Sequence, residues 1–285
     1  MAWELQFPAC LSRKLCYNVT VRWHMDRSNI EKIAREPEDK LLLAKLWDKI
    51  GAGMRKSIPS GTPFLSPREQ EMAKFLFGEA EGIFYFGGYE GAERKMVVYL
   101  PEYLDETYLM DEDSPIVCLR ASFYQGDTPS HRDFLGALMG SGISRESIGD
   151  ICVGKGSCDF FVTTQIAPYI LQNFTGAGRV KLHLEQIPLC EASIPDPETK
   201  EIRDTLASLR LDSVISSGFR IGRSLAVQHI HAGRAAIDGL PCEKPDKTVE
   251  EGAKISVRGL GKIRLTAING ETKKKRISVV IHRYV

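Results

Sequence analysis

The chain has 285 residues, of which 43% are hydrophobic and 26% charged, a composition that fits a folded protein and excludes disordered and low-complexity classes. No apolar segment approaches the about 20 residues of a membrane span, so no membrane segment is expected. The net charge of +1 is uneven, because residues 201–285 hold 16 Lys and Arg against 9 Asp and Glu, whereas residues 1–200 hold 22 against 28. The C-terminal part is therefore basic and favours an anionic partner.

The seven cysteines are odd in number and contain no Cys-x-x-Cys pair. Neither a disulfide framework nor a zinc site of the usual spacing is predicted. We interpret them as reduced thiols of a cytoplasmic protein, and we expect a monomer without metal or cofactor. Residues 1–25 carry charges that interrupt any apolar core. They are expected to form a disordered extension or, because Met25 precedes a clean helix start, to reflect a misplaced start.

Residues 26–82 are predicted to form a helical N-terminal unit. Apolar residues recur at helical spacing between Leu41 and Ile50. A further helix is predicted after Ser66, because serine is a common helix cap and Pro67 occupies the first helical position. The aromatic and methionine side chains of this region are interpreted as core.

Residues 83–191 are predicted to form a ferredoxin-like domain. Segments 82–91, 95–103 and 114–124 are rich in β-branched and aromatic residues, which is typical of strands. A helix is predicted at 131–139, two strands around the Gly-Lys-Gly-Ser turn at 154–157, a second helix at 163–174 and a strand at 180–189. The order strand, helix, strand, strand, helix, strand is that of a split βαβ sandwich, which RNA-recognition modules also use.

Residues 192–205 contain two prolines among charged and small residues and are the predicted linker. Residues 206–285 are predicted to form the last domain, in which helices over 204–218 and 222–233 lie against strands at 234–239, 253–268 and 275–285. The fold class is therefore α+β, in three parts.

Basic side chains gather at this helix pair. Arg220 and Arg223 lie at the start of the second helix, where unpaired backbone N–H groups also favour an anion, and Arg210 and Arg234 lie on either side. Each guanidinium offers a planar fork of donors that suits phosphate. The basic segment 271–278 is interpreted as a hairpin tip, which is either only solvated or extends this surface. The candidate RNA-binding residues are Arg210, Arg220, Arg223, Ser224, Gln228, His231, Arg234, Lys262, Lys273, Lys274, Lys275 and Arg276.

Two groups of residues resemble known families. Residues 208–258 resemble the alpha-L RNA-binding motif, the S4-like domain. The resemblance lies in the segments RLDSVISSG, GRSLAVQHIHAGRAAIDG and VEEGAKISV. Where that family usually has Ser, Leu and Asn, this chain has Gly222, His229 and Asp238. Residues 26–285 are similar to the bacterial YlmH-type RNA-binding proteins. The segments that carry this similarity are HRDFLGALMGSGISRESIGDI at 131–151 and GKGSCDFFV after it.

The YlmH resemblance implies cytoplasmic action on structured RNA. The implied partners are ribosomal RNA of the large subunit and a bound tRNA, in rescue or quality control of stalled translation. These partners follow from the resemblance and not from residue spacing.

The alternative is an RNA-modifying enzyme with its active site in the central domain. Arg-Leu-Asp at 210–212 resembles the catalytic aspartate motif of pseudouridine synthases, but only about 28 residues follow Val257, so Asp212 is assigned to the RNA-binding helix. His229 and His231 point about 200° apart on a helix and make a poor metal pair, and His229 is interpreted as core. Asp133 is interpreted as a helix cap. We predict a non-catalytic RNA-binding protein, with no catalytic and no metal-binding residue.

Overall fold

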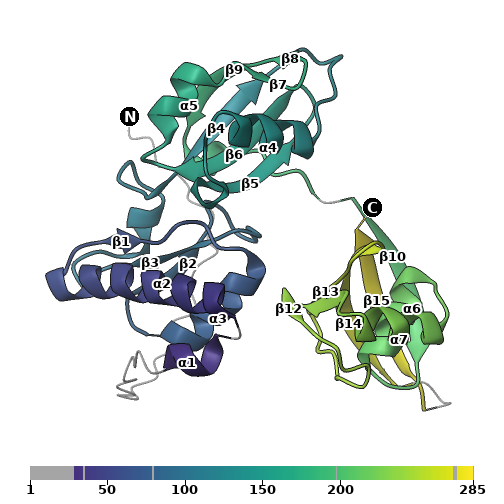
Figure 1. The fold of residues 1–285 in the computed structure, drawn as a ribbon. Coiled ribbons are helices and arrows are strands. Elements are labelled where there is room, and N and C mark those ends of the chain that lie inside the picture. Colours follow the sequence, from purple (N-terminus) through teal and green to yellow (C-terminus); the bar gives the residue numbers. More distant parts are fainter. Residues whose placement is uncertain (1–28, 35, 79, 197, 272–274, 285) are drawn as a thin grey trace, which may run out of the picture.

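The computed structural model describes residues 29–34, 36–78, 80–196, 198–271 and 275–284, which form three units in chain order (Figure 1). Helices and antiparallel sheets occur in all three, so the predicted α+β class is confirmed. The expected extension at 1–25 lies outside the described residues. None of the described helices is long and apolar enough to cross a membrane.

The N-terminal unit packs helices against a small sheet. Its elements are α1 (Asn29–Ile33), α2 (Pro37–Lys56), β1 (Ser60–Gly61), α3 (Pro67–Phe77), β2 (Ile83–Phe86) and β3 (Met96–Tyr99). The sheet order is β1-β3-β2, with both pairs antiparallel. Ser66 caps α3 as predicted: its hydroxyl accepts from the Glu69 N–H, and the Glu69 carboxylate accepts from the Ser66 N–H at 2.6 Å.

The strands at 83–86 and 96–99 correct the sequence assignment. They were placed in the central domain, but they pair with each other and with β1, in a sheet separate from the central one. The N-terminal unit is therefore not purely helical. Strand β3 is apolar throughout because both of its faces are buried: Val97 packs among the helices, whereas Met96 and Val98 pack against the central unit.

The central unit is a four-stranded antiparallel sheet with two helices on one face. Its strands lie in the order β5-β6-β4-β9, and the chain follows the predicted order of strand, helix, strand, strand, helix, strand. The elements are β4 (Ile116–Ser122), α4 (His131–Gly140), β5 (Ile148–Val153), β6 (Ser157–Thr163), α5 (Ala167–Asn173) and β9 (His183–Ile187), with the small pair β7 (Gly176–Ala177) and β8 (Val180–Lys181). Short 3₁₀ helices occupy Glu106–Leu109, Arg145–Ser147 and Leu189–Glu191.

The other face of the central sheet is covered by the N-terminal sheet. Cys118 and Phe161 of the central strands pack with Phe64, Met96 and Val98 in one buried cluster. In RNA-recognition modules this open face carries the aromatic side chains that stack on bases. Here the face is occupied by protein, so the central unit does not present it to a nucleic acid.

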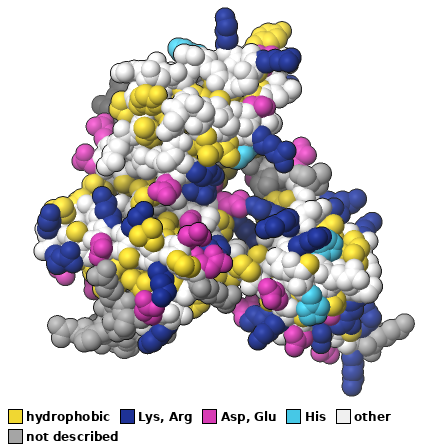
Figure 2. Space-filling model, in the orientation of Figure 1, with side chains coloured by type: hydrophobic (Ala, Val, Ile, Leu, Met, Phe, Trp, Pro, Cys, Tyr) yellow, Lys and Arg dark blue, Asp and Glu magenta, His cyan; other side chains and the backbone are white. Residues whose placement is uncertain are grey.

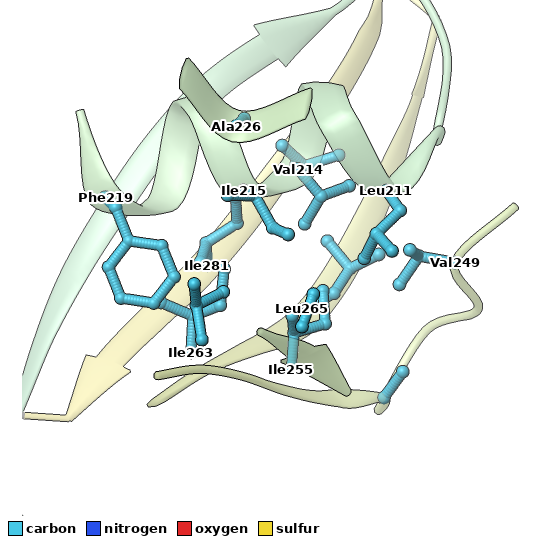
Figure 3. Close-up of a cluster of buried hydrophobic side chains, with 14 of the residues drawn as sticks. Leu211, Val214, Ile215, Phe219, Ala226, Val249, Ile255, Ile263, Leu265 and Ile281 are labelled. Carbon is cyan, nitrogen blue, oxygen red and sulfur yellow. The ribbon is translucent and has the colours of Figure 1, made fainter. Parts of the chain in front are cut away.

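The C-terminal unit is a six-stranded antiparallel sheet with two helices on one face. Its elements are β10 (Thr199–Leu206), α6 (Leu211–Phe219), α7 (Arg223–His231), β11 (Ala235–Ile237), β12 (Leu240–Pro241), β13 (Lys254–Val257), β14 (Gly261–Glu271) and β15 (Ile277–Tyr284). The sheet order is β10-β15-β14-β13-β11-β12. Figure 3 shows the core between helices and sheet, with Phe219 and Ile215 on the side of Ile263 and Ile281, and with Leu211 beside Val249.

Strand β10 corrects two further expectations. Residues 192–205 were predicted to be a linker and a helix to begin at 204, but residues 199–206 pair with β15 along the sheet edge, and α6 begins at Leu211. In β10 only Ile202 and Leu206 are buried, and most of the remaining residues are exposed. Such a charged edge strand lacks the apolar alternation by which a strand is recognised in a sequence.

The C-terminal unit contacts the N-terminal unit at two places. The turn at Gly239, before β12, lies against the start of α3, where a Cβ atom at Gly239 would come within 2.7 Å of the Arg68 backbone nitrogen. Lys262 on β14 forms an ion pair with Glu93, which precedes β3. These contacts set the sheet side of the C-terminal unit toward the other two units, with α6 and α7 on its far side (Figure 1).

Candidate nucleic-acid interface

The two helices of the C-terminal unit are joined by a tight turn at Arg220. This residue adopts a left-handed conformation (φ 56°), and its backbone N–H closes α6 by donating to the carbonyls of Ser216 and Ser217. Gly222 precedes α7 as its N-cap and supplies no capping side chain. The first-turn N–H groups of α7 are therefore left for another acceptor. The departure from the usual Ser at position 222 thus leaves the helix start without a protein cap.

A buried carboxylate holds two of the four predicted arginines. Asp212, 2% exposed, accepts hydrogen bonds on Oδ2 from Nε and Nη2 of Arg223 at 3.0 and 2.9 Å. Arg210 donates to both oxygens of the same carboxylate at 3.4 Å. The Arg210 and Arg223 side chains remain 42% and 55% exposed. Asp212 therefore fixes both guanidiniums in place while part of each stays accessible to a ligand.

The electrostatics of Asp212 agree with this geometry. Burial alone raises the pKa of its carboxyl, but the hydrogen bonds and charges of Arg223 and Arg210 outweigh burial and hold the pKa below its ordinary value. Asp212 is thus ionised at neutral pH. Two of the four arginines thus share one buried carboxylate, a contact that the sequence analysis did not predict.

The other two arginines are free for a ligand. Within the described part of the chain, the Arg220 and Arg234 side chains form no hydrogen bond or ion pair, and both residues are exposed. Ser224, Gln228 and His231, predicted to share one outward side of α7, are all exposed as well. We call these seven residues the helix-pair surface: Arg210, Arg220, Arg223, Ser224, Gln228, His231 and Arg234.

The remaining predicted residues do not lie on the helix-pair surface. Lys262 is on the opposite face of the sheet, paired with Glu93. Arg276 donates to the carbonyl and hydroxyl of Thr205 on β10. Lys275 is exposed in the turn between β14 and β15. The other two predicted residues of this turn, Lys273 and Lys274, lie outside the described residues.

The other departures from the alpha-L pattern have local explanations. Asp238 adopts a left-handed conformation (φ 48°), which asparagine and aspartate tolerate well, and its carboxylate accepts from the Lys254 N–H at 2.8 Å. His229 is half-buried, and its Nδ1 atom is buried without a hydrogen-bond partner in the described structure. His229 is therefore partly, not fully, buried, although the sequence interpretation placed it in the core.

Polar groups of the central unit that could serve catalysis have structural partners. Asp133 caps α4 by accepting from the Ser130 N–H at 2.8 Å, as predicted. Asp159, 1% exposed, accepts two hydrogen bonds from Arg120 at 2.8 and 2.7 Å. Burial raises the pKa of the Cys118 thiol to about 12 and that of Cys152 to about 11, so neither is a thiolate at neutral pH.

A cleft of about 1170 Å³ lies between the N-terminal and central units. It runs from α2 past residues 58–66 to the segments 144–147 and 163–165. Lys45 and Lys49 line one wall, and Arg94 and Arg145 line the other. Both arginines donate to the Ile148 carbonyl, at 2.9 and 2.7 Å, and the bond from Arg94 joins the N-terminal unit to the central unit. Among the residues that the structure describes, no group of three His, Cys, Asp or Glu side chains could hold a metal ion.

This surface combines guanidiniums fixed by a buried carboxylate, unpaired guanidiniums and a helix start without a capping side chain. Such groups offer hydrogen-bond donors and positive charge to an anion such as phosphate. Figure 2 shows the Lys and Arg side chains crowded over the C-terminal unit and around the hollow beside it. Comparison with known proteins identifies the family. The chain belongs to the YlmH family of RNA-binding proteins.

The family assignment rests on a family match and on a curated relative. Residues 125–191 match the family described as a putative RNA-binding domain in YlmH. The chain is 34% identical over 226 residues to the ribosome-associated protein quality control protein P2 of Bacillus subtilis (strain 168), covering 78% of this chain and 86% of that protein. A solved structure, the cell division protein YlmH from Streptococcus pneumoniae, matches 57% of this chain and 98% of its own, with 21% identity and a TM-score of 0.47.

Proposed function

We propose that this protein binds ribosomal RNA of the large subunit, and a bound tRNA, without catalysing a reaction, in quality control or rescue of stalled translation. The observation behind the proposal is the helix-pair surface, where Asp212 orients two arginines and Arg220 and Arg234 remain unpaired. Its family relative in Bacillus subtilis is named for ribosome-associated quality control. We further propose a cytoplasmic monomer that needs no cofactor.

In this proposal the C-terminal unit is an S4-like domain that docks on RNA through α6 and α7. Its arginines contact the phosphate backbone, which fixes position and affinity but reads no sequence. Ser224, Gln228 and His231 on the outward side of α7 then contact sugars or base edges. The central unit is a ferredoxin-like module whose sheet face is covered, so it contacts RNA through its helices and loops rather than by base stacking on strands.

The test is co-sedimentation of the full chain with purified large ribosomal subunits, with and without bound tRNA. We expect the double variant Arg220→Ala, Arg234→Ala to lose most of its binding, because both side chains are unpaired and serve no described structural contact. The matched control is Lys32→Ala, Lys49→Ala, which removes the same charge from exposed positions of α1 and α2. Equal binding by the two variants would refute the proposed surface.

A second measurement separates binding from catalysis. Ribosomal RNA incubated with the protein and then digested to nucleosides should show an unchanged chromatographic profile, pseudouridine included. A new nucleoside that requires a residue of the central unit would establish the alternative, an RNA-modifying enzyme.

A further inference from the structure

The C-terminal sheet has an outer face that α6 and α7 do not cover. In the antiparallel register Lys254 pairs with Arg264, and Lys262 lies two residues before Arg264 on β14. Cross-strand partners and residues two apart point to the same face of a sheet. The intervening residues, Ile255 and Ile263, lie in the core beneath the helices. The three basic side chains therefore share the outer face, and all three are exposed.

This outer face is turned toward the other two units. The ion pair between Lys262 and Glu93 crosses from β14 to the segment before β3. Lys95, two residues after Glu93, is near enough to Lys254 to be affected by its charge: burial lowers the pKa of Lys95 first, and repulsion by Lys74 and by Lys254 lowers it further. Cations from two units thus meet at this junction.

The central unit adds two more groups at the same place. His131 begins α4, and Arg145 begins the 3₁₀ helix before β5. Burial lowers the pKa of His131, and the charge of Arg145 lowers it further, with a smaller contribution from Lys262. Basic groups of all three units therefore lie within electrostatic range of one another around one junction.

The carboxylates at the junction are already engaged. Glu93 is paired with Lys262. Asp150 accepts from the Tyr89 hydroxyl at 2.8 Å and from the backbone N–H groups of Glu93 and Arg94 at 2.6 and 3.0 Å. The negative charges of Asp150 and Glu93 offset part of the positive charge of Lys95, His131 and Arg145. The basic side chains at the junction nevertheless outnumber these two carboxylates, and like charges brought together cost free energy unless an anion joins them.

We propose that this junction surface binds the phosphodiester backbone of an RNA strand that passes between the C-terminal unit and the other two units. One wall consists of Lys95, His131 and Arg145, and the other of Lys254, Lys262 and Arg264. The inference rests on the proposed RNA-binding function. It adds a second contact surface, on the side of the sheet opposite the helix pair, so that one RNA is held on both sides of the C-terminal unit.

The first test compares three double variants of the full chain by fluorescence anisotropy with a labelled RNA hairpin that has a single-stranded uridine tail. They are Lys254→Ala with Arg264→Ala at the junction, Arg220→Ala with Arg234→Ala on the helix pair, and Lys32→Ala with Lys49→Ala as the control. Binding is measured between about 50 and about 200 mM salt. If the two substituted side chains of a surface contact two phosphates, their removal should make the slope of log K against log salt shallower by about 1.4 to 1.8.

The outcomes separate the two proposals. If the junction variant loses slope and affinity relative to the control, the junction surface is supported. If only the helix-pair variant does so, the junction inference is overturned and the proposed function stands. If both variants bind like the control, both proposals are overturned.

The second test predicts a gain of binding, which loss of folding cannot mimic. Glu93→Gln removes the exposed carboxylate that neutralises Lys262 and leaves the backbone N–H bond of residue 93 to Asp150 intact. The variant should bind the same hairpin more tightly, with a slope steeper by about 0.7 to 0.9, the value for one further phosphate. Glu106→Gln, at an exposed position of the first 3₁₀ helix, is the matched control. Unchanged or weaker binding by Glu93→Gln would refute the junction surface.

Discussion

Arg223 and Asp212 are eleven residues apart in the chain, on different helices, and two guanidinium N–H groups of Arg223 meet a single oxygen of the Asp212 carboxylate at 3.0 and 2.9 Å. The carboxylate is almost wholly buried, whereas the guanidinium is more than half exposed. The contact therefore joins α6 to α7 and at the same time orients a phosphate donor. If the proposed function holds, this one pair of residues contributes both to stability and to RNA binding, and the two contributions can be separated by substitution.

Exchanging arginine for lysine should distinguish the anchored arginine from a free one. A lysine at 223 offers a single ammonium in place of the planar fork, so it cannot hold Asp212 and face a phosphate with separate N–H groups. Arg223→Lys should lose about 1.5 kcal/mol of RNA affinity, roughly tenfold. Arg234→Lys should change affinity little, because Arg234 has no described partner to keep. Anisotropy titrations of the two variants with RNA test this prediction. Equal losses of affinity would refute the anchoring role of the contact between Arg223 and Asp212.

The acid sensitivity of the C-terminal unit should depend on Asp212. Its folded-state pKa is lowered by Arg223 and Arg210 despite burial, so the stability from this ionised carboxyl is complete above its unfolded pKa of about 3.9. That stability is lost as the pH falls through the lower pKa that Asp212 has in the folded state. In urea titrations from about pH 6 to about pH 2, wild type should lose more stability than Asp212→Asn, which cannot titrate. Parallel pH profiles for the two proteins would contradict this assignment.

Arg220 is predicted to lower the stability of the folded protein and to contribute to RNA binding. Its left-handed backbone costs a non-glycine residue about 1 kcal/mol or more, and glycine is the residue that usually ends a helix in this conformation. Arg220→Gly should therefore be more stable to urea than Arg220→Ala by about 1 kcal/mol. Both variants should lose RNA affinity equally, because both lack the guanidinium. If Arg220→Gly bound RNA as wild type does, the guanidinium would have no part in binding.

The central unit should depend on Arg120 and Asp159 for folding and not for RNA contact. Removing one member of a buried pair leaves an uncompensated group and typically costs about 3 to 5 kcal/mol. Asp159→Ala should lose about this much in chemical denaturation, because Asp159 also accepts from the Ser193 N–H at 2.7 Å. Asp127→Ala, at an exposed position of the central unit, is the control. RNA affinity of Asp159→Ala should equal wild type wherever the variant is still folded.

Local features of the fold were predictable from the sequence. Ser66 with Pro67 marked the start of α3, Asp133 an acceptor for an N–H group at the start of α4, and the glycines at 154 and 156 the turn between β5 and β6. These signals act over a few residues, so their physical causes are contained in short segments. The gathering of arginines around α6 and α7 was predictable for the same reason.

Only the tertiary structure decided which of those arginines are free, since a buried carboxylate on α6 reaches α7 across a turn. It also showed that β2 and β3 belong to the N-terminal sheet, that β10 is an edge strand, and that the central sheet is covered on both faces. Strand pairing and ion-pair partners depend on register and docking between distant segments. A sequence determines them only through the whole packed fold, because no short pattern specifies which edge or charge a segment will meet.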